Sequence, residues 1–165
     1  NYEDRESFVF SRLLSKQPIF LANGGKSIHS FIYAGDVASA IVRVLSLSRE
    51  KGSEEFNLAI PQATTSRGFV DLASEVCGIE PNVVSYQPEE FQIDTINFDL
   101  KNVAFPFPEN NAYLSSEKIL NRLGFTPAYG LQSMLSEYYE WWMKGPNKAP
   151  KEYPLESRIK EGLGK

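Results

Sequence analysis

Proline and glycine residues divide this chain into short segments that alternate between helical and strand-like patterns. Pro18, Gly52, Pro61, Gly78 and Gly124 each stand where a periodic run of apolar residues ends. Because proline cannot continue a helix and glycine is favoured just past a helix end, these positions set the boundaries of the elements. The alternation predicts an α/β (α+β) fold, with a small mixed sheet and about five helices around one core.

Apolar residues at helical spacing predict helices in five parts of the chain, one of them capped by Asp36. They cover Glu3 to Lys16, a segment from Asp36 to before Gly52, a segment from Thr64, Thr65 or Ser66 to Gly78, a segment from Ser115 or Ser116 to Gly124, and Leu131 to about Met143. In the first, the side chains expected to face water include Arg5, Ser11, Arg12 and Ser15, and the apolar stripe is Phe8, Val9, Leu13 and Leu14. In the second, the expected buried face is Val37, Ala40, Ile41, Val44 and Leu45.

Short apolar runs rich in β-branched and aromatic residues predict the strands. They are Ile19 to Leu21, Ser27 to Tyr33, Phe56 to Ile60 and Val83 to Tyr86. Asn23-Gly24-Gly25 separates the first two and tolerates the positive φ of a tight turn, so these two runs are predicted to form a β-hairpin. Pro88 to Asn111 has no periodicity and is predicted to be an irregular loop, the kind of segment in which functional residues often lie.

The composition excludes several classes of protein. Cys77 is the single cysteine and His29 the single histidine, so neither an internal disulfide nor a clustered Cys/His metal site is expected. The net charge of −4 disfavours a purely electrostatic hold on a nucleic acid. No apolar run approaches the roughly 18 residues of a membrane span, and we expect a cytoplasmic protein that does not cross a membrane. The chain starts without Met or a signal-like segment, which suggests a fragment.

The charge is uneven along the chain, which predicts two parts. Residues 1–143 are predicted to form the domain, and 144–165 a charged, loosely held tail. The tail holds six basic and three acidic residues, a composition typical of a solvated segment. Leu155, Ile159 and Leu163 have the spacing of one or two helical turns within it.

The motifs of several enzyme classes are absent from the sequence. No glycine-rich turn joins a strand to a helix, as dinucleotide binding requires. None of the eight tyrosines has a lysine four residues later, the spacing that lets an ammonium lower the pKa of a phenol. No phosphate-binding P-loop, G-x-S-x-G or H-E-x-x-H motif occurs either. We therefore predict no catalytic residue, cofactor site or metal site in this chain.

Four segments in order nevertheless resemble one family. They are Pro18 to Gly25, His29 to Ala38, Phe56 to Leu58, and Ser116-Glu117-Lys118 with Leu123 to Pro127. They look like the C-terminal part of an extended short-chain dehydrogenase, the NAD-dependent epimerase/dehydratase family. Lys101 to Phe107 and the charged tail resemble, more narrowly, the chloroplast stem-loop binding protein branch of that family, which has RNA-binding members.

The resemblance implies a division of labour. The N-terminal half of such proteins is a dinucleotide-binding domain that holds NAD(P) and the Tyr/Lys catalysis, and the C-terminal half closes over a nucleotide-sugar. The resemblance thus implies that this chain is the substrate-binding domain of an isomerase or oxidoreductase and is inactive alone. Its expected partners are the missing N-terminal domain and a sugar-nucleotide-like small molecule. In one arrangement, a second copy of the chain forms a homodimer with it.

The resemblance also names candidate substrate-binding residues. They are Phe20, His29, Phe31, Phe105, Asn110 and Tyr113. The family typically has an arginine for the substrate diphosphate at the position of His29, and a second near Phe105. Both guanidiniums are missing here, which weakens the expected hold on a diphosphate because only arginine offers permanently charged, bidentate bonds.

Three alternatives stay open from the sequence. His29 is either a ligand contact or a structural histidine, and the Phe105 to Pro108 segment either walls a pocket or is a packing loop. If the chain is not a substrate-binding domain, the alternatives are an RNA-binding module and a non-catalytic interaction domain that uses an inherited fold.

Overall fold

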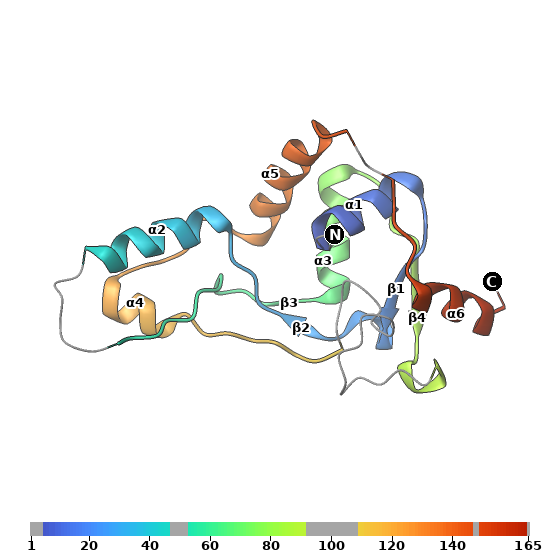
Figure 1. Cartoon of the computed structure of the whole chain (residues 1–165), viewed down its shortest axis with the longest axis horizontal. Helices are drawn as coiled ribbons and strands as arrows, with labels where there is room; N and C mark the ends of the chain where they lie inside the picture. The colour runs from blue at the N-terminus through green and yellow to red at the C-terminus, as the bar shows by residue number, and fades with distance from the viewer. Residues whose placement is uncertain (1–4, 47–52, 92–108, 147–148, 165) are drawn as a thin grey trace.

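The computed structural model of the chain describes residues 5–46, 53–91, 109–146 and 149–164 (Figure 1). Helices α1, α3 and α5 gather in the middle, α2 and α4 lie at one end, and β1, β4 and α6 at the other. The elements are α1 (Arg5–Ser15), β1 (Ile19–Ala22), the 3₁₀ turn η1 (Asn23–Gly25), β2 (Ile28–His29), α2 (Ala34–Leu45), β3 (Thr64–Thr65), α3 (Ser66–Cys77), β4 (Val83–Tyr86), the 3₁₀ turn η2 (Pro88–Phe91), α4 (Glu117–Leu123), α5 (Leu131–Met143) and α6 (Pro154–Gly162).

The predicted fold class, a mixed α/β fold, is confirmed, but the predicted hairpin is wrong. β1 pairs in parallel with β4, Ile19 opposite Val83, whereas β2 pairs antiparallel with β3, Ile28 opposite Thr65. All four residues of β1 are buried, the burial typical of a parallel strand covered on both faces. The Asn23–Gly25 turn therefore sends the chain away from β1 instead of folding it back.

The strand predicted over Phe56 to Ile60 is also absent, since these residues belong to no ladder in the described part of the chain. Ile60 N donates to Phe31 O at 2.7 Å, and Ala59 N donates to Ser116 Oγ at 2.6 Å. The segment is thus held by a backbone hydrogen bond to Phe31 and by the side-chain hydroxyl of Ser116, and not by a neighbouring strand.

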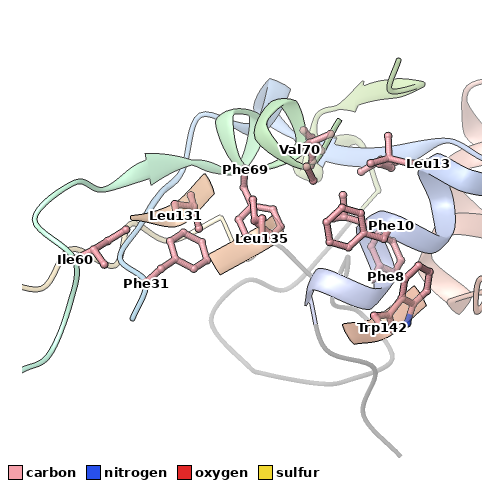
Figure 2. Packing of buried hydrophobic residues seen from close by; sticks show 14 residues of the cluster. Phe8, Phe10, Leu13, Phe31, Ile60, Phe69, Val70, Leu131, Leu135 and Trp142 are labelled. Carbon is pink, nitrogen blue, oxygen red and sulfur yellow. The ribbon is translucent and has the colours of Figure 1, made fainter. Parts of the chain in front are cut away.

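The main core lies between α1, α3 and α5 (Figure 2). The Phe10 ring stacks 6.1 Å from Trp142 and packs against Tyr139 at 4.7 Å. Trp142 is buried while Trp141 is 65% exposed, as two adjacent helical positions about 100° apart require. The expectation that Ser11 and Arg12 face water is wrong, because both are fully buried in α1.

Asp36 is not the cap that the sequence predicts. α2 already begins at Ala34, and the buried carboxylate of Asp36 accepts from the backbone N–H groups of Ala128 at 2.9 Å and Tyr129 at 3.2 Å. It ties α2 to the chain that leads into α5. The predicted buried face of α2 is wrong in part, because Ala40 is buried but three other members are exposed: Ile41, Val44 and Leu45.

The remaining helix boundaries follow the sequence closely. Thr65 caps α3 by accepting from Gly68 N at 2.9 Å, and Gly78 ends that helix in the left-handed conformation, as Gly124 ends α4. Ser116 precedes α4, but its hydroxyl bonds to Ala59 instead of capping the helix. Among the described helices, none combines the length and the apolar character needed to cross a membrane.

The end of the chain is packed over its described part, 149–164. The predicted turns form α6, whose Leu155 and Ile159 are fully buried against Phe20 and Val84 of β1 and β4. Glu156 of α6 forms a buried ion pair with Arg12 of α1 at 2.5 Å. These residues are not loosely held, and the division of the chain at 143 stays a prediction.

Replacing Glu156 by alanine tests this packing. Glu156→Ala leaves the buried guanidinium of Arg12 without its counter-charge, and we expect the free energy of unfolding to fall by about 3–5 kcal/mol. Urea unfolding followed by circular dichroism measures the change. The exposed Glu152→Ala is the control, with an expected change below about 0.5 kcal/mol. Equal stability of the two variants would show that α6 does not depend on the pair.

Candidate binding site

A small polar cavity of about 180 Å³ opens where β1 ends. The described residues that line it are Ala22, Asn23, Lys26, Ser27, Glu109 and Asn111. Most of these residues carry hydrogen-bonding side chains, and Lys26 supplies a positive charge. The volume is below that of a cavity for a whole drug-sized ligand, so it suits one group of a larger molecule, such as a phosphate or part of a sugar.

The turn after β1 brings these side chains together. Asn23, Gly24 and Gly25 all have positive φ, at 51°, 71° and 74°. A Cβ at Gly25 would lie 2.7 Å from Leu21 Cδ1 and 2.9 Å from Arg67 N, so the turn approaches the start of α3 as closely as only glycine allows. Lys26 and Ser27 follow directly and line the cavity.

The opposite wall comes from a segment far along the chain. Asn111 Oδ1 accepts from Ile28 N at 2.8 Å, Ala112 N donates to Ile28 O at 2.7 Å, and Ser30 N donates to Ala112 O at 2.9 Å. β2 therefore has β3 as one neighbour and residues 111–112 as another. This pairing fixes Asn111 across from Lys26 and Ser27.

A buried histidine lies behind the cavity. His29 is 3% exposed, and its Nε2 lies 3.1 Å from Ser27 Oγ and 2.9 Å from Ser66 Oγ. The two hydroxyls are 2.8 Å apart, so the three groups form a closed hydrogen-bonded cluster. Of the three, only Ser27 lines the cavity. The geometry makes His29 a group that positions the Ser27 hydroxyl.

The charges of the site follow from its burial. Burial lowers the pKa of His29, and the nearby positive charge of Arg5 lowers it further, so the imidazole is neutral at pH 7. Burial and the neighbouring Glu89 raise the pKa of Glu109. Of the described residues that line the cavity, Lys26 is the one basic residue and Glu109 the one acidic residue.

The structure places the five described candidate residues, of the six that the sequence proposes as substrate contacts, in different surroundings. Phe20 and Phe31 are buried in different cores, and Phe31 stacks on Phe69 at 5.1 Å. Asn110 is exposed between two residues that line the cavity, Glu109 and Asn111. Tyr113 lines another cavity, of about 170 Å³.

Phe105 lies outside the described residues, and the role of all six in binding stays a prediction. The sequence interpretation missed Asn23, Lys26, Ser27 and Glu109. The signal that points to Lys26 and Ser27 is a pair of polar residues immediately after a glycine turn that ends an apolar run, and Asn23 is the first residue of that turn.

The cavity offers hydrogen-bonding side chains and one cation to a polar group. Within the described ranges, no three His, Cys, Asp or Glu side chains are grouped to hold a metal ion. The turn after β1 leads into the short β2 and not into a helix, so it does not present the helix N-terminus on which a dinucleotide pyrophosphate is held. The described residues at this turn therefore do not fit NAD.

Comparison with known proteins places the chain in context. No family model matches it. The chain is 33% identical, over 84% of its length, to the chloroplast stem-loop binding protein of 41 kDa b of Arabidopsis thaliana, and 28% identical, over 87%, to GDP-L-fucose synthase 1 of the same plant. The matches cover 35% and 42% of these two proteins, so the chain spans well under half of their length.

Solved structures share the fold. UDP-glucose 4-epimerase of Thermotoga maritima, solved with UDP-glucose, superposes with a TM-score of 0.65 at 19% identity, covering 87% of this chain and 40% of that one. UDP-glucuronic acid 4-epimerase of Bacillus cereus, solved with UDP-glucuronic acid and NAD, gives 0.66 at 12%, covering 86% and 40%. The chain thus has an epimerase/dehydratase-like fold. Sequence and fold together confirm its resemblance to the extended short-chain dehydrogenases, and the stem-loop binding protein branch is among its sequence relatives.

The single histidine offers a direct test of the buried cluster. Because the pKa of His29 is lowered in the folded chain, the unfolded chain takes up a proton near pH 6.5 as the pH falls, and the folded chain does so only at a lower pH. The contribution of neutral His29 to the free energy of unfolding is therefore fully present above pH 6.5 and is lost as the pH falls below it. We expect the His29 Hε1 resonance to titrate with a midpoint below 6.5. The free energy of unfolding should decrease between pH 7 and 5.5, and less so in His29→Gln. A midpoint at or above the ordinary value would place His29 in water.

Proposed function

We propose that this chain forms the substrate-binding part of an epimerase/dehydratase-like protein, and that the cavity at the end of β1 takes one polar group of a nucleotide-sugar or related substrate. The observation that carries the proposal is the convergence of Lys26, Ser27 and Asn111 at that cavity. Two structures with the same fold were solved with UDP-glucose and with UDP-glucuronic acid, which supports a substrate of this class.

The chemistry of the lining residues matches such a group. The ammonium of Lys26 attracts a phosphate as a point charge, while the Ser27 hydroxyl and the asparagine amides donate hydrogen bonds. Glu109 is an acceptor for a sugar hydroxyl. Because neutral His29 stands where the family resemblance implies an arginine, the hold on a diphosphate is weaker than a bidentate guanidinium would give.

The cofactor and the proton-transferring groups belong, in this proposal, to an N-terminal domain outside this chain. The turn after β1 does not fit a dinucleotide, and α2 exposes an apolar face of Ile41, Val42, Val44 and Leu45. A contiguous exposed apolar face marks a surface that another part of a protein covers. We propose that the NAD(P)-binding domain packs on this face of α2, and a homodimer that uses it is the alternative arrangement.

Calorimetric titration tests the binding proposal. We expect UDP-glucose to bind this chain weakly and Lys26→Met to reduce its affinity at least about 10-fold, in line with the loss of about 1.5 kcal/mol or more for one charged hydrogen bond. Lys16→Met, an exposed lysine at the end of α1, is the matched control and should change nothing. NAD should give no heat of binding. Tight NAD binding by this chain would refute the division of labour, and equal affinity of both lysine variants would remove the cavity from the site.

The exposed face of α2 is tested separately. Leu45 is 78% exposed and Leu135 is 1% exposed. We expect Leu45→Ser to change the free energy of unfolding by under about 0.5 kcal/mol, and Leu135→Ala to cost about 2–5 kcal/mol. Urea unfolding and analytical ultracentrifugation on the same samples compare stability with self-association. A large loss of stability in Leu45→Ser, together with dissociation of a dimer, would favour the homodimer arrangement.

The RNA-binding alternative, suggested by the stem-loop binding relative, is not favoured. The chain carries a net charge of −4. Within the described part of the tail, Arg158 Nη2 donates to Phe91 O at 2.6 Å, so this cation is engaged with the protein itself. Filter binding of the intact chain in rising salt discriminates between the two functions, because an RNA held through phosphate contacts is released as the salt concentration rises.

A further inference from the structure

A second and larger cavity, of about 450 Å³, lies between α1, α5 and the start of α2. It shares no described lining residue with the cavity at the end of β1. Its volume is in the range of small-molecule sites. Its apolar lining includes Leu131, Met134 and Leu135.

Three aromatic rings also line this cavity. Tyr33 enters from the chain before α2, and Tyr138 and Trp141 come from α5. Tyr138 and Trp141 pack edge to face with centroids 5.5 Å apart. Trp141 is 65% exposed, whereas the adjacent Trp142 is in the core. The core does not require Trp141, and its ring is available to a ligand.

Two carboxylates lie among these rings. Glu6 comes from the first turn of α1 and Glu137 from α5. The Tyr33 hydroxyl donates to Glu137 Oε1 at 2.5 Å, which orients the carboxylate and raises the pKa of Tyr33 to about 12. The phenol therefore stays protonated and neutral. Among the described residues that line this cavity, none is basic.

The aromatic rings and the carboxylates favour the same kind of ligand. The face of an aromatic ring carries negative electrostatic potential and attracts a cation, and the effect is strongest for tryptophan. The Glu137 carboxylate attracts the same charge and disfavours an anion, while the charge of Glu6 is partly offset by the neighbouring Arg5. We infer that this cavity binds a small organic cation, an ammonium group that carries an apolar body. This site is independent of the proposed nucleotide-sugar site.

Choline and its neutral carbon isostere, 3,3-dimethylbutan-1-ol, are the probes. The two molecules differ in charge but hardly in shape, so their comparison isolates the cation. NMR follows the two tryptophan indole N–H resonances at constant ionic strength. We expect choline to shift the Trp141 signal saturably with little effect on Trp142, and the isostere to bind at least roughly fivefold more weakly, as a cation–π contact of about 1 kcal/mol predicts.

Variants on α5 separate the contributions. Glu137→Gln keeps an acceptor for Tyr33 but removes the charge, and should weaken choline binding about threefold or more. For the two Trp141 variants, which lack that indole signal, the broadening of the choline methyl resonance is followed instead: Trp141→Leu should weaken binding further, and Trp141→Phe should restore part of it. Glu140→Gln, an exposed residue of the same helix that does not line the cavity, is the matched control. Equal binding of choline and its isostere, no saturable shift, or equal effects of Glu137→Gln and Glu140→Gln would each overturn the inference.

Discussion

The guanidinium of Arg12 is fully buried and is held by acceptors from three separate parts of the chain: Pro18 O at 2.9 Å, Lys151 O at 2.6 Å and the Glu156 carboxylate at 2.5 Å. A buried charge must be paired and hydrogen-bonded, because its desolvation is otherwise too costly. The residues before β1 and those before and within α6 must therefore lie against α1. Arg12 Nε and Glu156 Oε1 have no hydrogen-bond partner among the described residues, so the pairing is incomplete. The pair is better explained as a device that fixes this arrangement than as a large net gain in stability.

The position of β1 links this buried pair to the candidate site. Pro18, whose carbonyl Arg12 holds, directly precedes β1, and the polar cavity opens at the other end of the same short strand. β4 and α6 bury β1 from its sides, so the strand is a rigid support for the turn that follows. Gly25 then allows the turn to approach α3, where Ser66 joins the cluster of Ser27 and His29. The geometry of the site thus depends on packing that begins at the two ends of the chain.

Local features of the sequence were predictable and long-range ones were not. The helix around Phe69 and the end of the helix at Gly124 follow from periodicity and from glycine, which act within a few residues. The partner of β1 is β4, more than sixty residues away, and no local pattern distinguishes it from the nearer run that follows Gly25. The sequence predicts that Arg12 faces water, because charged residues are rarely buried without a partner. Its partner in the structure, Glu156, is 144 residues away in the chain. His29 likewise depends on Ser66, which the sequence marks only as a possible start of a helix and not as a partner of His29.

The apolar faces of α2 and α5 differ in burial, and this difference supports the proposed function. Both helices have the apolar periodicity of a buried face, but Leu135 of α5 is covered by α1 and α3, whereas Leu45 of α2 is exposed. In the proposed arrangement, this exposed face of α2 is the surface on which the NAD(P)-binding domain packs. The relatives that the chain matches are more than twice its length. An exposed apolar helix at one end of the molecule and a polar cavity at the end of β1 are the features we expect of one wall of a cleft whose other wall carries the cofactor.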